Sequence, residues 1–148
     1  MKPVVYLFVV LTIFLFVSCA SSVYNLPDNE KDPIISRTYD VAYATVFNTC
    51  LETLEESGWT INNTDKESGI ITTEYKLNDN VLTSALMGQY RSKYSVRIKK
   101  IDDKKSKVTL TIQSEREKAA GSWEPETMTQ YNYESQSKDF WAKLTSKI

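Results

Sequence analysis

The side chains of this sequence best suited to covalent chemistry are its two cysteines, Cys19 and Cys50. Cys50 falls within a stripe of apolar residues at helical spacing, which predicts a buried and inert thiol. The chain has no histidine, which excludes the commonest zinc ligand and every Cys–His or Ser–His–Asp nucleophile. Cys19 is different, because it directly follows Ser18 at the end of a long apolar run.

The carboxylates offer no better catalytic site. Glu52, Glu55 and Glu56 share one predicted helix, whereas a glycosidase needs two carboxylates that face each other across a cleft. Asp102 and Asp103 lie in a lysine-rich turn, which argues against calcium. A formal net charge of −1 argues against nucleic acid as a partner. We therefore expect a protein that is not an enzyme, with no catalytic residue, metal site or cofactor.

Residues 1–18 have the pattern of an export signal. Lys2 and the amino terminus supply positive charge, and Val4–Val17 is almost purely apolar but shorter than the roughly 20 residues of a membrane-spanning helix. Ser18 and Cys19 then resemble the end of a lipobox, the processing motif of bacterial lipoproteins. The resemblance implies cleavage between these two residues and attachment of lipid to Cys19. An ordinary signal peptide and an uncleaved anchor are the alternatives.

The region after the signal divides into a tether and a domain. Residues 19–33 contain two prolines and many polar side chains without periodicity, so we expect a lipidated N-terminus and a flexible tether. Residues 34–148 are expected to form one domain. Ala20 stands where aspartate favours inner-membrane retention in some lipoproteins. The expected location is therefore the outer membrane, with the domain exported and anchored in the cell envelope, facing the periplasm.

The hydrophobic pattern of residues 34–148 predicts an α+β domain of two layers. Apolar residues at three- and four-residue spacing predict a helix over 40–57, with Asp40 as its N-cap and Gly58 just beyond its end. Strict alternation predicts half-buried strands. The expected order is β-α-β-β-β-β-α, with two helices on one face of an antiparallel sheet of about four or five strands. The expected elements are strands over 34–39, 59–64, 70–77, 93–99 and 108–115, and a C-terminal helix that starts between about 125 and 136.

This order of elements, behind a lipobox, resembles the helix-grip domains of the BamC (NlpB) family of envelope lipoproteins. The residues that carry the resemblance are Tyr39–Tyr43 at the start of the first helix, Glu56–Trp59 at its end, and Asp65–Ile71 in the hairpin that follows. The resemblance implies a non-enzymatic accessory lipoprotein, anchored to the membrane by lipid and bound to an envelope protein. It names no partner, and it leaves the oligomeric state open.

Two surfaces are candidates for that interaction. Strand parity places Lys93, Arg97, Lys99 and Thr111 on the sheet face that neither helix covers. This face could meet a protein, anionic lipid or lipopolysaccharide, although a plain solvated face with a cross-strand ion pair from Glu115 to Arg91 or Lys93 is the simpler interpretation. The second surface is a groove between the last helix and the sheet, for which the candidate residues are Trp123 and Tyr131.

The sequence therefore carries two hypotheses on function. The first is a lipid-anchored interaction module that docks on an envelope protein. The alternative is an envelope binding protein that holds a small apolar ligand or lipid in the groove between helix and sheet.

Replacing Cys19 by alanine tests the lipid anchor. Because the thiol is the only attachment point that a lipobox provides, the Cys19→Ala chain is expected to remain an unprocessed precursor without incorporated palmitate. Metabolic labelling with palmitate, followed by gel analysis, measures both effects. Cys50→Ala is the matched control and should be labelled like the wild type. Normal labelling of the Cys19→Ala chain would contradict the lipobox.

Overall fold

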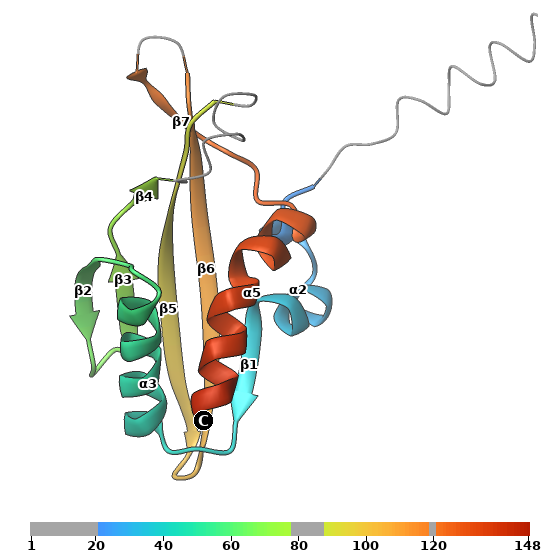
Figure 1. Cartoon of the computed structure of the whole chain (residues 1–148). Helices are drawn as coiled ribbons and strands as arrows, with labels where there is room; N and C mark the ends of the chain where they lie inside the picture. The colour runs from blue at the N-terminus through green and yellow to red at the C-terminus, as the bar shows by residue number, and fades with distance from the viewer. Residues whose placement is uncertain (1–20, 78–87, 119–120) are drawn as a thin grey trace, which may run out of the picture.

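An open antiparallel sheet with two helices packed on one face is the framework of the computed structural model (Figure 1). The structure describes residues 21–77, 88–118 and 121–148, so Ser18 and Cys19 lie outside the described residues. The two-layer α+β class is as predicted, but within these residues the sheet has seven strands instead of about four or five, and an additional helix, α2, precedes the first strand. The strands are β1 (Ser36–Tyr39), β2 (Ile61–Asp65), β3 (Ile70–Thr73), β4 (Lys76–Leu77), β5 (Tyr90–Asp102), β6 (Lys105–Glu117) and β7 (Trp123–Pro125).

The sheet follows the order β1-β6-β5-β3-β2, with β4 beside β5 and β7 beside β6. The long β5–β6 hairpin is its centre. Of the two partners that the sequence allows for Glu115, Arg91 and Lys93, the register selects Arg91. Alternation holds along both strands, so one face is buried and the other carries polar side chains. The helical segments are a 3-10 turn, η2 (Val23–Asn25), and the helices α2 (Asp28–Ile35), α3 (Tyr43–Glu56) and α5 (Gln130–Lys147).

The core lies between the sheet and the pair α3 and α5, which contact each other (Figure 1). Leu51, Trp59 and Ile61 are only partly buried, at its margin. All buried apolar side chains of the described residues fall between positions 23 and 144, so a chain that starts at Ser21 retains this core. They are Val23, Ile35, Val46, Phe47, Cys50, Leu54, Ile71, Tyr94, Val96, Ile98, Val108, Leu110, Ile112, Met128, Tyr133, Phe140, Trp141 and Leu144.

The predicted start of the first helix is wrong, whereas its end is confirmed. Asp40 does not cap α3; the N-cap is Ala42, without a side-chain hydrogen bond, and Asp40 instead pairs with Lys105 at 3.3 Å. Gly58 follows the helix with a φ of +73°, in the left-handed region where a glycine has no steric cost. The C-terminal helix begins at Gln130, within the predicted range, behind Thr129, whose hydroxyl accepts from the Asn132 amide.

The prediction of a flexible tether over residues 19–33 is wrong from Ser22 onward. Ser22 caps η2, and Val23 is 1% exposed in the core. The Val23 amide donates to the Met128 carbonyl at 2.7 Å, which joins this segment to the approach to α5. The segment is polar, but it folds because a few apolar side chains and backbone hydrogen bonds hold it on the domain. The folded unit therefore starts near residue 22 instead of 34.

Two tyrosine hydroxyls, one of them from the N-terminal segment, pair backbone groups at the outer edge of β6. On its outer side β6 pairs with β1 over Ser106–Thr109 and with β7 over Glu115–Glu117. Between these strands, Tyr133 Oη donates to the Leu110 carbonyl at 3.0 Å. Tyr24 Oη donates to the Ile112 carbonyl at 2.8 Å and accepts from the Ile112 amide at 2.7 Å. The hydroxyls thus take the place of a neighbouring strand, since buried backbone groups must be paired.

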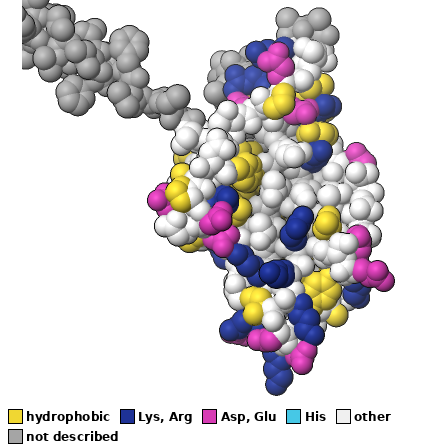
Figure 2. All heavy atoms as spheres, turned by 180° about the vertical axis from the view of Figure 1, so that it is seen from behind, with side chains coloured by type: hydrophobic (Ala, Val, Ile, Leu, Met, Phe, Trp, Pro, Cys, Tyr) yellow, Lys and Arg dark blue, Asp and Glu magenta, His cyan; other side chains and the backbone are white. Residues whose placement is uncertain are grey.

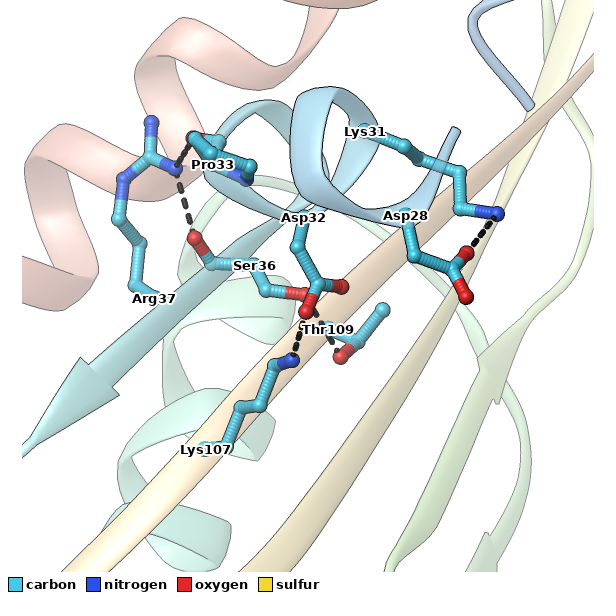
Figure 3. A network of polar contacts seen from close by, with 8 residues as sticks. All are labelled: Asp28, Lys31, Asp32, Pro33, Ser36, Arg37, Lys107 and Thr109. Carbon is cyan, nitrogen blue, oxygen red and sulfur yellow. Dashed lines mark hydrogen bonds and ion pairs between the residues drawn. The ribbon is translucent and has the colours of Figure 1, made fainter. Parts of the chain in front are cut away.

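Helix α2 crosses the β1 edge and reaches over the uncovered face of the sheet (Figure 3). Asp32 accepts from Lys107 of β6 at 2.6 Å, and the Ser36 and Thr109 hydroxyls lie 2.9 Å apart on the same face. The Arg37 guanidinium donates to the Pro33 carbonyl at 2.6 Å, so a cation caps the end of the helix. One edge of the face that was expected to be bare is therefore covered.

Removing the Tyr24 hydroxyl tests this account of the β6 edge. Tyr24→Phe leaves both backbone groups of Ile112 without this partner and is expected to cost about 1–3 kcal/mol in the free energy of unfolding. Denaturant unfolding measures the loss. Tyr131→Phe is the matched control, because Tyr131 is 79% exposed, and it should change stability by less than about 0.5 kcal/mol. Equal effects of the two substitutions would show that the segment is a tether after all.

Candidate binding surfaces

The sheet is longer than the helices that cover it, which leaves a groove on the helix side. The 13 residues of β5 extend about 43 Å, whereas the 14 residues of α3 rise only about 21 Å. On the helix side, the part of β5 and β6 that extends beyond α3 forms the groove together with α5. The groove has a volume of about 810 Å³. This volume is within the usual range of ligand sites, about 300–1,000 Å³.

Aromatic rings form the base and sides of this groove. Trp59 and Tyr94 stack with ring centres 4.1 Å apart, and Tyr94 meets Phe140 edge to face at 6.4 Å. Tyr90 and Tyr131 also line the groove. Tyr131 is one of the most exposed large apolar side chains of the described residues, which leaves its ring available to an occupant. The rings offer flat apolar surface for stacking.

Polar groups of the groove converge on Gln136 of α5. The Ser92 hydroxyl donates to Gln136 Oε1 at 3.1 Å and lies 2.8 Å from the Ser114 hydroxyl. Tyr94 Oη donates to the Gln136 carbonyl at 2.6 Å, and burial raises the pKa of this phenol, so it stays protonated. Arg116 pairs with Glu126 at the rim. The groove can therefore combine ring stacking with hydrogen bonds to one occupant.

The two residues predicted for the groove lie on opposite faces of the sheet. Tyr131 lines the groove, as expected. The prediction that Trp123 lines it is wrong. Trp123 of β7 pairs with Glu117 of β6, and its ring contacts Arg91 on the face of the sheet that α3 and α5 do not cover. Sequence reasoning missed Trp59 and Tyr90 as groove residues. The signal available for Tyr90 was the alternation of the β5 strand, extended beyond the predicted start at residue 93.

On the uncovered face, Lys93, Arg97, Lys99 and Thr111 share one side of the sheet, as predicted from strand parity. Figure 2 looks onto this side and shows Lys and Arg side chains on a mostly polar surface. In β2, simple alternation from Ile61 would place Thr64 on this face too, but the register shifts between Ile61 and Asn63, so Thr64 faces the helix layer.

Where β5 begins and β6 ends, this face carries a cluster that we call the aromatic clamp, formed by Tyr75, Arg91 and Trp123. The Arg91 guanidinium lies 4.4 Å from the centre of each ring. It also donates to Glu115 at 2.7 Å, and Tyr75 Oη donates to the same carboxylate at 2.9 Å. Hydrogen bonds from Arg91 and Tyr75 hold the pKa of Glu115 below its usual range. The carboxylate is therefore ionised and fully engaged near neutral pH.

The cysteine chemistry of the described residues is limited to Cys50, which is free and buried in α3. Burial raises the pKa of its thiol to about 12, so the nucleophilic thiolate is scarce at neutral pH. Among residues 21–77, 88–118 and 121–148, no three or more acidic, cysteine or histidine side chains gather as metal ligands.

No protein-family model matches the chain, and no curated protein matches it. In the described part of the chain, none of the helices is both long and apolar enough to cross a bilayer.

The burial of Cys50 predicts how its thiol reacts. In the native protein at pH 8, alkylation by iodoacetamide is expected to be slow, because both exclusion and the raised pKa suppress the thiolate. Adding denaturant should raise the rate to that of a free cysteine. Mass spectrometry of the modified chain follows the reaction in Cys19→Ala protein, so that only one thiol is present. Rapid alkylation under native conditions would contradict the buried position.

Proposed function

We propose that this protein is a lipid-anchored lipoprotein of the cell envelope that acts as a non-enzymatic interaction module. The anchor is supported by the sequence alone, through the apolar run to Val17 and the Ser18–Cys19 pair. In this proposal the lipid holds the chain at the outer membrane, and the groove beside α5 receives a segment of an envelope protein.

The observation that carries the proposal is the groove itself. Trp59, Tyr90 and Tyr131 present ring surface there, and such side chains dominate the energetics of binding sites. The groove offers hydrogen-bonding groups beside these rings. The chain has no histidine, and the two carboxylates that line the groove among the described residues, Glu126 and Asp139, are each paired with a cation, Arg116 and Lys143. Its chemistry therefore suits binding better than catalysis.

A small ligand is the second candidate, and the size of the groove favours it. A volume of about 810 Å³ would accommodate a ligand of ordinary size. The hydroxyls of Ser92 and Ser114 and the amide of Gln136 favour a ligand with polar groups over a purely apolar lipid. We therefore expect a ligand with polar groups instead of the purely apolar ligand that the sequence suggested.

Filling the groove tests both versions. Ser135 is an exposed α5 residue that lines the groove, so Ser135→Trp is expected to block it without disturbing the core. A photo-crosslinking amino acid placed at Tyr131 should capture a partner in intact envelopes, and Ser135→Trp should abolish this product. Ser146→Trp is the matched control, since Ser146 is also exposed on α5 but lies outside the groove.

The same variants separate a protein partner from a small ligand. Native mass spectrometry of protein extracted from envelopes should show added mass that Ser135→Trp removes, if the occupant is small. A crosslinked protein without such added mass identifies the interaction module. Equal crosslinking in the Ser135→Trp and Ser146→Trp chains, with no added mass in the wild type, would refute the groove as the binding site.

A further inference from the structure

The short distance between the proposed anchor and the folded domain limits where the domain can sit. The folded unit starts at Ser22, whose hydroxyl caps η2. A fully extended chain from Cys19 to Ser22 spans only roughly 10 Å. If Cys19 carries lipid, the domain must therefore lie against the bilayer surface, whereas a flexible tether of residues 19–33 would have held it away. This step rests on the proposed function.

The position of Ser22 determines which side of the domain lies nearest to the anchor. Ser22 and Tyr24 line a shallow depression together with Tyr75, Gln113 and Glu115. Gln113 and Glu115 belong to the uncovered face of β6, opposite Lys93 and Arg91. The chain therefore enters the fold at the border of the uncovered face, next to the aromatic clamp.

The uncovered face carries a basic row, which we define as Lys93, Arg97 and Lys99 of β5. Within the described part of the chain, none of the three forms an ion pair. The acidic groups of the two central strands on this side are Glu115, bound to Arg91, and Glu117. Asp32 of α2 neutralises Lys107. The charge left over in the basic row is positive.

The register shows what lies beside the other two members of the row. Lys99 lies directly opposite Lys107 on β6, whose charge is paired with Asp32. Arg97 lies opposite Thr109, and it is exposed, as is Lys99. A basic row of this kind suits an anionic surface, where each cation near the headgroups adds to binding.

The aromatic clamp adds a second feature of membrane surfaces. Trp123 is partly exposed, and its ring, like that of Tyr75, contacts the Arg91 guanidinium. Tryptophan and tyrosine favour the headgroup region of a bilayer, because the ring is apolar and the polar end remains hydrated. Gln113, which lines the depression at Ser22, lies opposite Lys93, and Glu115 of the same depression lies opposite Arg91. The entry of the chain therefore adjoins both the clamp and the first residue of the basic row, on one face of the sheet.

From this arrangement we infer that the uncovered face docks on the anionic headgroups of the same bilayer that holds the lipid anchor. The basic row contacts the headgroup phosphates, and Trp123 enters the headgroup layer. The helix-side groove then points away from the membrane, toward the aqueous compartment, where it stays open to its occupant.

Vesicle binding by a chain of residues 21–148 tests the inference without the lipid. The wild-type chain is expected to sediment with vesicles of phosphatidylcholine containing about one third phosphatidylglycerol, but not with phosphatidylcholine alone. Reversal of the basic row (Lys93→Glu, Arg97→Glu and Lys99→Glu together) should lower the affinity by about 100-fold or more. The matched control reverses three exposed lysines off this face (Lys66→Glu, Lys104→Glu and Lys138→Glu) and should retain most of the binding.

Fluorescence supplies an independent readout of the clamp. Phospholipids brominated on the acyl chain near the headgroup should quench the protein in anionic vesicles, and Trp123→Phe should remove most of that quenching. Circular dichroism of each variant confirms that it is folded. Three results would each overturn the inference: no binding to anionic vesicles, equal loss in the two triple variants, or binding to a soluble polyanion such as heparin as tight as to the vesicles.

The result is independent of the fate of Cys19. Vesicle binding with failed palmitate labelling would remove the lipid anchor and leave the docking face. Palmitate labelling without vesicle binding would leave the anchor and remove the docking face.

Discussion

The outer edge of β6 is the constraint on which the rest of the structure depends. Its exposed backbone groups need partners along its whole length, and no single strand of the chain supplies them. The strands β1 and β7 cover the two ends, and the hydroxyls of Tyr24 and Tyr133 cover the gap between them. These contacts fix the N-terminal segment and the start of α5 in the same place. The contact that satisfies the sheet edge thus also sets the distance between the domain and Cys19.

How far the sequence predicts this fold depends on the range of the interactions. The β5–β6 hairpin and α3 follow from local periodicity, which reports burial directly. Residues 22–33 have no period, and their order comes from partners such as Ile112 and Met128, far away in the chain. The face of Trp123 was equally inaccessible, because strand parity cannot be continued across the break after Glu117. Tyr131 could be assigned to the groove, since it belongs to the same helix as Phe140.

The two faces of the sheet differ in what they leave exposed. On the helix side, β5 and β6 extend beyond α3, and the groove contains rings and uncharged hydrogen-bonding groups along with ion-pairing residues at its rim. On the other side, Arg91 and Lys107 are engaged by carboxylates, while the basic row is not. The groove, with its rings and hydrogen-bonding groups, and the basic row thus lie on opposite faces of the same sheet. This separation allows two unlike surfaces to be occupied at once.

The hydrogen bonds between Tyr24 and Ile112 also bear on the order in which the segments of the chain fold. A chain that emerges N-terminus first exposes residues 22–26 long before β6 and Met128 exist to receive them. Because long-range contacts form late, this segment is among the last to settle, after the β5–β6 hairpin has closed. Residues 22–26 therefore remain accessible while the rest of the chain folds. If the chain is processed between Ser18 and Cys19, as we propose, the enzyme has that interval in which to act.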